Sequence, residues 1–408
     1  MSTWLIPEQD LTPEQIRAIE LHPKEHRLIV GGPGSGKTQV LLHRARYLCD
    51  HYHVKPGKYR IFVFTKMLKE YIKSALDLLD LPENCVINFD AWCRDYFQTH
   101  IGGKMPWNAE ERQPDYDKIR RAVRDNLYMS LFSTQEYDFV LVDEGQDLDG
   151  VSFDILKAIA THITVCMDKK QQIYERGSDE TEILKRLGLR KKNLAFLEVF
   201  RGCPYVARLA AEFINDPEER QLYLRQTKTA QSERQLPLLY AAADFEDERD
   251  RLLDVIRTRL LIGDKIAILL PQNRQVFGFA KGLEEAGLDV ETPNNIDFNT
   301  DLPKLMPYHS AKGLTFDTVL MPRLVPRSFP RFGADHIDRL LFVGISRATR
   351  WVYLSTSEEK PLPALDKLKL LAAGGGLTIQ YAADQIISED QVAPTRSGQN
   401  SDDLLDLL

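Results

Sequence analysis

The sequence has few cysteines and no spacing among them that would indicate a disulfide framework or a metal site. The five are Cys49, Cys85, Cys93, Cys166 and Cys203, and no two of them form a C-x-x-C pair. An odd number without regular spacing argues against paired disulfides and against a structural zinc or iron–sulfur site. We expect these thiols to fill apolar cores as small side chains.

Long apolar runs are also missing. No segment approaches the roughly 18 consecutive apolar residues that a membrane-spanning helix needs. The N-terminus, MSTWLIPEQDLTPEQ, carries acids and prolines where a secretory signal would have a basic stretch followed by an apolar run. The sequence therefore predicts a cytoplasmic protein with no membrane partner.

Basic residues are not in excess either. The chain carries 53 lysines and arginines against 60 aspartates and glutamates, which gives a formal net charge of -7. This balance excludes a uniformly basic nucleic-acid-binding protein. An acidic protein can still carry a locally basic groove, so nucleic acid is not excluded as a partner.

What is present is enough apolar sequence for two or three compact domains. The chain has 408 residues, of which 43% are hydrophobic. Short runs rich in branched and aromatic residues alternate with helical, charge-speckled stretches. The first series of runs is 28–30, 60–65, 86–89, 139–143, 163–167 and 195–200, and the second is 238–243, 266–270, 306–309, 318–321 and 351–355. This alternation predicts an α/β fold with two lobes of mostly parallel sheet, residues 1–193 and 194–385.

The last part of the chain, residues 386–408, differs in composition from the rest. It is rich in Gln, Pro, Ser, Asn and Asp and ends in the acidic and apolar sequence DDLLDLL. This composition predicts a disordered acidic tail. The tail could serve only solubility, or it could be a short docking peptide for a groove on a protein partner.

The strongest motif is a phosphate-binding loop of the form G-x-x-x-x-G-K-T. Its residues are Gly31, Gly32, Pro33, Gly34, Ser35, Gly36, Lys37 and Thr38. It follows the apolar run 28–30 and precedes the helical pattern 39–48, which is the strand–loop–helix context that the motif requires. Glycines let backbone N–H groups surround phosphate oxygens, while Lys37 reaches the β- and γ-phosphates and Thr38 binds Mg²⁺. The predicted cofactors are ATP and Mg²⁺.

A second motif, residues 139–144, places two carboxylates at the end of an apolar run. In FVLVDE the strand would end at Asp143 and Glu144. Asp143 is suited to hold Mg²⁺, and Glu144 is suited to polarise the water that attacks ATP. Together with the loop at 31–38, this motif predicts the site of a nucleoside triphosphate hydrolase.

The form D-E-x-Q-D at residues 143–147 resembles motif II of superfamily 1 helicases of the UvrD/Rep type. Other stretches resemble motifs of that family and follow in the family's order. They are 11–15 (Q motif), 64–66 (Ia), 88–90 (Ib), 168–174 (III), 200–201 (IV), 308–316 (V) and 341–348 (VI). The resemblance covers about residues 11 to 357. It implies two RecA-like lobes with the ATP site in the cleft between them.

The resemblance also implies roles for individual residues. Gln15 would read the adenine edge, Phe200 would stack on the adenine, and Arg347 would be the arginine finger of the second lobe. The implied catalytic set is Lys37, Thr38, Asp143, Glu144, Gln171, Arg201 and Arg347, with Thr38 and Asp143 as the metal ligands. Further nucleotide contacts are Gln39 and Gly313, besides residues 31–38. The implied contacts to nucleic acid are Phe64, Thr65, Phe89, Trp92, Tyr174 and His309, and for each aromatic ring a place in the core is the alternative.

The sequence departs from the family pattern in three respects. Tyr174 is followed by Glu-Arg-Gly, so the tryptophan that stacks on a base in the family is missing. Thr315 stands where the family has a glutamate near the ribose. The chain is also too short for the family's large accessory subdomains, and a small insertion at about residues 100–135, helical over 108–128, is expected instead. Its basic residues could form a solvated helix face or contact a nucleic-acid strand: Arg112, Lys118, Arg120, Arg121 and Arg124.

Three functional hypotheses follow from these motifs. The first is an ATP-dependent translocase or helicase on single-stranded DNA, with the 3′-to-5′ direction implied by the family. The second is an ATP-gated interaction or loading module that binds nucleic acid, and a partner through residues 386–408, without processive unwinding. The third replaces DNA with RNA, because phosphate and stacking contacts do not distinguish the sugar well.

Overall fold

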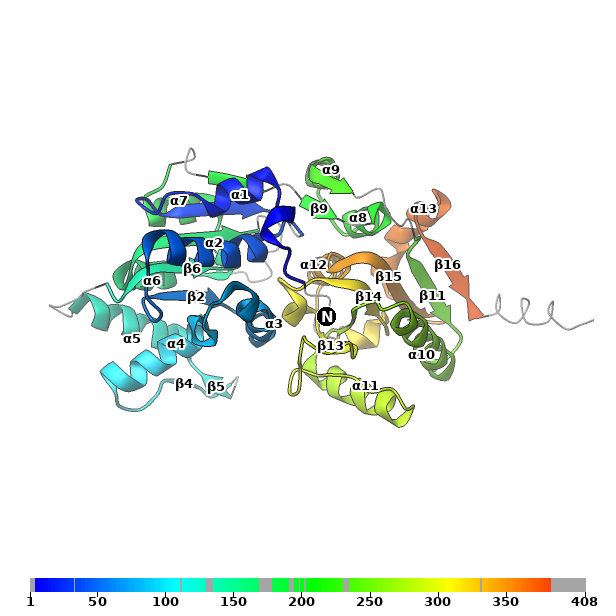
Figure 1. The fold of residues 1–408 in the computed structure, drawn as a ribbon. Helices are drawn as coiled ribbons and strands as arrows, with labels where there is room; N and C mark the ends of the chain where they lie inside the picture. The colour runs from blue at the N-terminus through cyan, green and yellow to red at the C-terminus, as the bar shows by residue number, and fades with distance from the viewer. Residues whose placement is uncertain are drawn as a thin grey trace, which may run out of the picture.

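The structure is a computed structural model, and it has two α/β lobes side by side (Figure 1). It describes residues 4–32, 34–110, 112–129, 135–168, 178–190, 194–197, 199–201, 203–229, 235–330 and 332–382, with the residues in 194–201 described by their backbone alone. The first lobe contains the N-terminus and the second lobe most of the C-terminal half. The α/β class with two parallel sheets, expected from the sequence, is confirmed.

The first lobe is built on a six-stranded parallel sheet of order β3-β2-β6-β7-β1-β8. Its strands are β1 (Arg27–Gly31), β2 (Tyr59–Val63), β3 (Val86–Asn88), β6 (Tyr137–Val142), β7 (Ala160–Met167) and β8 (Leu194–Leu197). Alternate residues of one strand belong to different cores: Ile29 faces one hydrophobic cluster, whereas Leu28 and Val30 face another. Both faces of the sheet are therefore covered, which explains why the strands are continuous apolar runs.

Helices cover each face of this sheet. They are α1 (Pro13–Ile19), α2 (Lys37–Tyr52), α3 (Lys66–Leu76), α4 (Phe89–Tyr96), α5 (Tyr116–Met129), α6 (Gly150–Ile159) and α7 (Glu180–Leu187). Short helical turns connect them: η1 (Glu8–Asp10), η2 (Asp77–Leu79), η3 (Glu83–Cys85), η4 (Phe97–Ile101) and η5 (Gly145–Asp147). Helices α1, α2 and α3 pack into one cluster, and α4 to α7 pack into the other. The loops that follow β1, β2 and β6 all lie at the carboxyl edge of the sheet, where ligands bind in open α/β folds.

The second lobe repeats this plan with the strand order β13-β12-β14-β15-β11-β16, again all parallel. The strands are β11 (Leu238–Ala242), β12 (Ile266–Leu270), β13 (Lys304–Pro307), β14 (Phe316–Met321), β15 (Ala348–Ser357) and β16 (Thr378–Tyr381). The helices and turns are α8 (Pro204–Ala211), α9 (Pro217–Gln226), α10 (Phe245–Leu261), α11 (Asn273–Glu285), α12 (Ala334–Ile345), α13 (Leu368–Ala373), η7 (Tyr308–Ala311), η8 (Pro326–Ser328) and η9 (Pro363–Lys367). A parallel pair, β9 (Val199–Arg201) with β10 (Thr227–Thr229), lies outside the two main sheets.

One hydrophobic cluster extends across both lobes. It contains Leu68 and Tyr71 of α3 together with Tyr308, Ala311 and Leu314 of the second lobe. In Figure 1, α3 lies at the side of the first lobe that faces the second. The two lobes therefore share buried apolar surface along α3.

The strand order corrects the expected domain boundary. The sequence predicted that the second lobe begins at residue 194, but β8 pairs in parallel with β1, so the first sheet continues to Leu197. The reason is that β8 is an edge strand of the first sheet, and its position in the sequence cannot show with which sheet it pairs. Residues 383–408 lie outside the described part of the chain, so the disordered tail stays a prediction.

The expected helical insertion is only partly helical. Its first part is an antiparallel hairpin, β4 (Trp107–Asn108) with β5 (Gln113–Pro114), and only then does α5 begin. Proline at position 114 and the left-handed backbone of Arg112 (φ 55°) do not fit a helix. In α5, Arg120 binds Asp90 at 2.7 Å and Asp117 at 2.5 Å. This arginine thus stabilises the packing of α5 on α4, which favours a structural role over a contact to nucleic acid.

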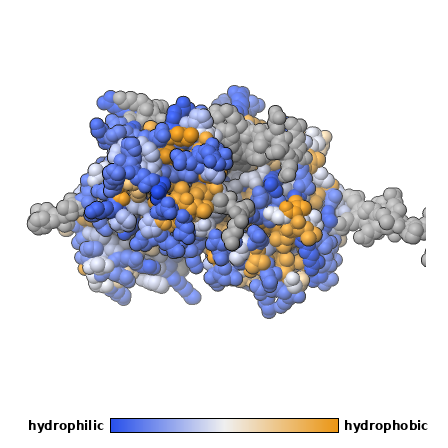
Figure 2. Space-filling model, in the orientation of Figure 1, coloured by the Kyte–Doolittle hydropathy of each residue, from blue (hydrophilic) through white to orange (hydrophobic). Residues whose placement is uncertain are grey.

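The face of the molecule seen in Figure 2 is mainly hydrophilic. Figure 2 shows blue over most of the visible face, with apolar areas on both lobes. The most exposed large apolar side chains come from separate elements: Leu261 (87%), Leu370 (84%) and Met129 (83%). All five cysteines are free, and four of them are buried. Within the described residues, no helix has the length and apolarity that a membrane crossing requires.

A buried polar cluster fixes α2 against the sheet. Arg44 is fully buried and donates from Nη1 to the carbonyls of Ile19 and Leu21, each at 2.7 Å. Its Nε donates to Thr164 Oγ1 at 2.9 Å, and its Nη2 lies 3.1 Å from Nε2 of His162. Since the guanidinium can only donate, His162 must accept at Nε2 and is neutral in the folded state.

This cluster predicts a loss of stability below neutral pH. Burial, followed by the charge of Arg44, lowers the pKa of His162 to about 3. In the unfolded chain the pKa of a histidine is near its ordinary value of about 6.5, so the unfolded state takes up a proton first. The stabilising contribution is complete above pH of about 6.5 and decreases towards pH of about 3, by at most about 1.4 kcal/mol per pH unit.

We expect His162→Gln, which keeps an acceptor for Arg44, to flatten this dependence. The measurement is the difference in thermal midpoint between variant and wild type from pH 7 to pH 5, because Asp143 and Asp147, which also titrate in this range, contribute equally to both proteins. His100→Gln, at an exposed position on η4, is the control and should retain the wild-type slope. Equal slopes for wild type and His162→Gln would contradict the assignment.

Candidate functional site

The phosphate-binding loop lies between β1 and α2, as the motif predicts. Gly34 and Gly36 each have φ of 78°, a left-handed conformation that glycine adopts at little cost. A Cβ atom on Gly36 would lie 2.5 Å from Nε2 of Gln15, so a side chain at this position would displace the amide of Gln15. Pro33 lies outside the described residues. The first turn of α2 follows directly, and its free N–H groups and dipole favour an anion over the loop.

Lys37 is positioned over this loop by three partners. Its Nζ donates to the carbonyls of Gly31 and Gly32, each at 3.0 Å, and lies 3.4 Å from Oδ2 of Asp168. Only 7% of the side chain surface is exposed. The ammonium group is therefore held inside the loop, where phosphate oxygens can replace the carbonyls as its partners.

Thr38 and Asp143 meet across the carboxyl edge of the first sheet. The hydroxyl of Thr38 donates to Oδ2 of Asp143 at 2.7 Å. Burial, and next the charge of Glu144, raise the pKa of Asp143 to about 6. A divalent cation would favour the ionised carboxylate and replace the hydroxyl proton as its partner. Since Mg²⁺ prefers a few oxygen ligands and retains several waters, this pair of oxygens next to a phosphate loop fits Mg²⁺.

Glu144 is held in a constrained backbone conformation beside Asp143. It has φ of 53°, which is unusual for a residue with a side chain. Its Oε2 accepts from Nε2 of Gln146 at 2.5 Å and lies 3.5 Å from Nζ of Lys312. Burial favours the neutral form, but the charges of Lys312, Lys37 and Arg347 outweigh it and lower the pKa. Glu144 is therefore a carboxylate at neutral pH, as a general base requires.

Gln15 connects the N-terminal helix to the phosphate loop. Its Oε1 accepts from the backbone N–H of Thr12 at 2.9 Å, which completes a capping box at the start of α1. Its Nε2 donates to the carbonyl of Ser35 at 3.2 Å. Gln39, unlike Gln15, does not bind the phosphate loop through its amide. Both ends of its amide bind the backbone of the N-terminal segment: Oε1 accepts from Ile6 N at 3.0 Å, and Nε2 donates to Trp4 O at 2.7 Å.

Arg347 approaches this site from the second lobe. It lies two residues after the end of α12, and its guanidinium donates to the carbonyl of Val343 at 3.1 Å and to the hydroxyl of Ser346 at 2.9 Å. Only 5% of its surface is exposed. Gly313 of the second lobe lies close to the first lobe, since a Cβ atom on it would lie 3.1 Å from Leu68 of α3. Both residues lie in the segments that resemble motifs V and VI.

A single cleft brings the predicted residues of the two lobes together. It has a volume of about 800 Å³. The first lobe contributes Trp4, Ile6, Asp10, Thr12, Gln15, Gly34, Gly36, Lys37, Thr38, Gln39, Tyr71 and Glu144, and the second lobe contributes Lys265, Gly313, Thr315, Phe316, Asp317, Ser346, Arg347 and Arg350 among others. The cleft thus combines phosphate-binding, carboxylate and arginine groups, which is the chemistry of a hydrolase of nucleoside triphosphates.

Two buried residues of the site were absent from the predicted set. Nζ of Lys312 lies 2.6 Å from Oδ2 of Asp147, so a salt bridge joins η5 of the first lobe to the segment after η7 of the second. Burial raises the pKa of Asp147 to about 6, although Lys312 opposes this shift. Both residues lie within the stretches that resemble motifs II and V. The signal was therefore available, but nothing in the sequence shows that the two motifs meet through these side chains.

The side chains of four further predicted site residues are not among those that the structure describes. Gln171 and Tyr174 lie outside the described residues. Phe200 and Arg201 lie in β9, for which the backbone alone is described. Their assigned roles stay predictions.

Two of the residues predicted to contact nucleic acid belong to the core. Phe89 is fully buried and Trp92 is 7% exposed, and both pack in the cluster under α4. The indole of Trp92 donates to the hydroxyl of Tyr137 at 3.2 Å. Neither ring has a free face for a base, so their prediction as stacking residues is wrong. Phe64, Thr65 and His309 are only partly buried and stay candidates.

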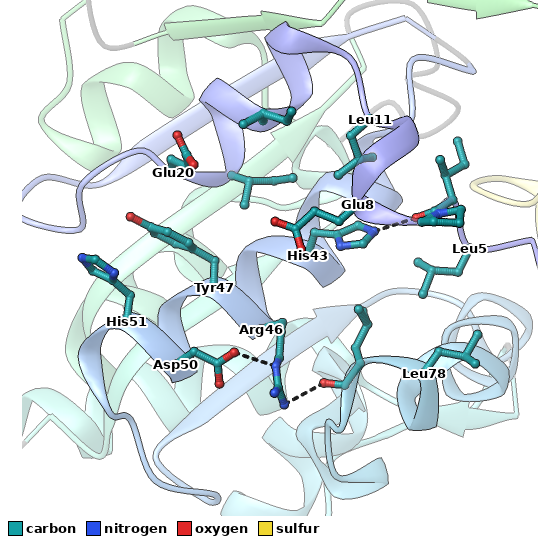
Figure 3. A pocket seen from close by; sticks show the side chains of 15 residues that line it. Leu5, Glu8, Leu11, Glu20, His43, Arg46, Tyr47, Asp50, His51 and Leu78 are labelled. Atoms are coloured by element: carbon teal, nitrogen blue, oxygen red, sulfur yellow. Dashed lines mark hydrogen bonds and ion pairs between the residues drawn. The ribbon is translucent and has the colours of Figure 1, made fainter.

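A second hollow in the first lobe is separate from the cleft. It has a volume of about 610 Å³ and lies between the N-terminal segment and α2 (Figure 3). None of the predicted site residues lines it, and among the described residues Ile6 alone lines both the hollow and the cleft. Figure 3 shows His43 pointing to the N-terminal segment, where its Nε2 lies 2.9 Å from the carbonyl of Ile6. The N-terminal segment therefore separates the two spaces.

Comparison with known proteins identifies sequences similar to both lobes. Residues 11–133 and 118–188 match the model of the UvrD/REP helicase N-terminal domain, and residues 299–359 match that of the UvrD-like helicase C-terminal domain. A protein of Mycoplasma pneumoniae described as a probable DNA helicase is 25% identical over 246 residues, which cover 54% of this chain and 44% of the relative. The mitochondrial ATP-dependent DNA helicase HMI1 of Saccharomyces cerevisiae is 23% identical over 372 residues, covering 69% of this chain and 53% of the relative.

The chain spans about half the length of these curated relatives. Among solved structures, the C-terminal domain of a possible DNA helicase from Lactobacillus plantarum WCFS1 aligns with 44% of this chain and 98% of its own length. Its sequence identity is 18% and its TM-score 0.35.

Proposed function

Because the chain belongs to the UvrD/REP family of superfamily 1 helicases, we propose that it is an ATP-dependent translocase or helicase on single-stranded DNA. The single observation that carries this proposal is the cleft, in which Lys37, Thr38 and Glu144 of one lobe face the same space as Arg347 of the other. The 3′-to-5′ direction is taken over from the family resemblance.

The side chains of the cleft have separate roles in hydrolysis. Lys37 neutralises the β- and γ-phosphates, while Glu144, ionised and next to them, orients and deprotonates the attacking water. Arg347 stabilises the charge that develops on the transferred phosphoryl group. Thr38 and Asp143 would hold Mg²⁺, which supplies further neutralisation of the phosphate oxygens.

Hydrolysis becomes movement because the ATP site is shared between the lobes. ATP contacts both lobes only when they are close together, so ATP binding favours the closed arrangement of the lobes. Hydrolysis of ATP removes these contacts and allows the lobes to separate again. The segments that carry Phe64, Thr65 and His309 belong to different lobes and would contact the strand. Their contacts are to phosphates and base faces, so the grip would be independent of base sequence.

The proposal is tested by ATP hydrolysis with and without polynucleotides. We expect single-stranded DNA to stimulate the rate more than duplex DNA does, with single-stranded RNA as the third arm. A strand-separation assay on duplexes with either a 3′ or a 5′ tail then gives the direction. The proposal fails if no polynucleotide stimulates hydrolysis, and greater stimulation by RNA would make RNA the track.

A second function, an ATP-gated loading module, is supported by one observation. Where the family has an accessory subdomain, this chain has the β4–β5 hairpin and α5, a small surface for separating strands. A loading module would hydrolyse ATP normally, would not separate tailed duplexes and would retain a protein partner through residues 386–408. Unwinding by the purified chain would rule this function out.

A further inference from the structure

The N-terminal segment forms part of the nucleotide cleft through side chains of α2. Gln39 and His43 lie one helical turn apart and together bind the backbone of Trp4 and Ile6 at three points, between 2.7 and 3.0 Å. Gln39 comes directly after Thr38 in the sequence. Residues 4–6, which we call the strap, are therefore fixed against α2 by the residue that follows Thr38 of the phosphate loop and by a residue one turn further on.

The strap places an aromatic ring in the wall of the cleft. The ring of Trp4 stacks on that of Tyr71 with centroids 4.0 Å apart and an angle of 18° between the planes. The indole N–H is shared between the carbonyl of Tyr71 at 3.2 Å and the hydroxyl of Ser74 at 3.0 Å. Because stacking and hydrogen bonds both act on it, the ring has a fixed orientation. Trp4 and Tyr71 both line the cleft.

Tyr71 extends this wall to the second lobe. Thr315 of the second lobe lines the same cleft as Tyr71. The ring of Phe298 contacts Tyr71 edge to face, with centroids 5.0 Å apart and an angle of 78°. The stacked pair is thus held from both lobes and lies where the lobes meet.

The position of the wall indicates which part of a nucleotide it would contact. Phosphates bound over Gly34–Thr38 leave the sugar and base to extend along the cleft, beyond the loop. Outside the loop, the first-lobe residues that line the cleft include Trp4 and Ile6 of the strap, Gln15 and Tyr71. Among cleft residues with described side chains, the first lobe offers two aromatic rings, those of Trp4 and Tyr71. An aromatic wall suits the flat, weakly polar nucleoside and has no charge to offer the phosphates.

We propose that the stacked pair of Trp4 and Tyr71 positions the nucleoside part of ATP, and that Trp4 is a determinant of nucleotide affinity. The inference rests on the proposed function and names further residues of the same site. Gln39 acts through the strap as a positioning residue, because its amide is committed to Trp4 and Ile6.

The test compares a ligand with a nucleoside and a ligand without one. Calorimetric titrations of the full chain with Mg-ATP and with Mg-tripolyphosphate measure both affinities in the absence of DNA and of turnover. We expect Trp4→Ala to weaken Mg-ATP binding about tenfold, the loss of one aromatic stacking contact. Its affinity for tripolyphosphate should stay within about twofold of wild type. Trp4→Phe should retain most of the affinity for ATP, and Gln39→Ala should repeat the selective loss.

Two results would overturn the inference. One is an ATP affinity of Trp4→Ala within about twofold of wild type. The other is an equal loss for ATP and tripolyphosphate, which would show that the strap only supports the phosphate loop. Trp107→Ala, at a 57% exposed position on β4, is the matched control and should leave both affinities unchanged. A wild-type chain that binds no Mg-ATP would refute the proposed function itself.

Discussion

Replacing Lys37 with alanine is expected to reduce the rate of ATP hydrolysis about 10³-fold, with or without single-stranded DNA. The ammonium group of Lys37 is buried in the phosphate loop, 3.0 Å from two carbonyls that it can exchange for phosphate oxygens. No other described lysine or arginine of the first lobe lines the cleft. The charge on the transferred phosphoryl group would therefore lose its nearest cation in that lobe. Steady-state hydrolysis at saturating ATP measures the effect.

Two variants separate chemistry from folding. Lys37→Arg keeps the positive charge next to Asp168, so this variant should fold normally. Its ATP hydrolysis should remain strongly impaired, because the guanidinium is bulkier and planar and cannot replace the ammonium group in the loop. Lys281→Ala removes a lysine whose side chain is 78% exposed on α11 and should hydrolyse ATP at the wild-type rate. Hydrolysis by Lys37→Ala within about tenfold of wild type would mean that ATP is hydrolysed at another site.

The nucleotide half of the site was predictable because it is local in sequence. The loop around Gly36 requires glycine at positions of left-handed backbone, and Asp143 follows an apolar strand, so short patterns carry their own geometry. The parallel sheets were predictable for the same reason. Strands buried on both faces are continuous apolar runs, and their alternation with helices leaves few topologies.

The contacts between distant segments were not predictable in this way. The sequence shows that Phe89 and Trp92 are aromatic, but burial depends on α4 packing against the sheet, and both rings proved to be core residues. Edge strand β8 pairs with β1 across more than a hundred and fifty residues of sequence, which no local pattern records. The strap is a similar case, because nothing near Trp4 indicates that Tyr71 will stack on it.

The salt bridge between Lys312 and Asp147 is a buried link between the lobes at the ATP site. The side chains are 4% and 5% exposed, and Nζ of Lys312 also lies 3.5 Å from Glu144. Two carboxylates of one lobe therefore depend on one ammonium group of the other. Movement of the second lobe away from the first would take the ammonium group away from both carboxylates and weaken the attraction that keeps them ionised. The link thus connects the position of the second lobe to the residue that activates water.

Replacing Lys312 with methionine is expected to lower both stability and hydrolysis. Methionine fills a similar volume but leaves Asp147 and Glu144 buried without their cation. Loss of one partner from a buried ion pair costs about 3–5 kcal/mol. Hydrolysis should fall about 100-fold or more, because Glu144 loses the first of the charges that keep it ionised. The thermal midpoint and the rate at saturating ATP measure the two effects.

The double variant Lys312→Met, Asp147→Asn decides between a structural link and a functional one. Removing the unpaired carboxylate of Asp147 should restore much of the lost stability, since the remaining amide carries no charge. Hydrolysis should stay low, because Glu144 still lacks its neighbouring cation. Recovery of both stability and rate would show that Lys312 serves only to neutralise Asp147. Recovery of stability alone would establish that the second lobe acts on the catalytic carboxylate through this lysine.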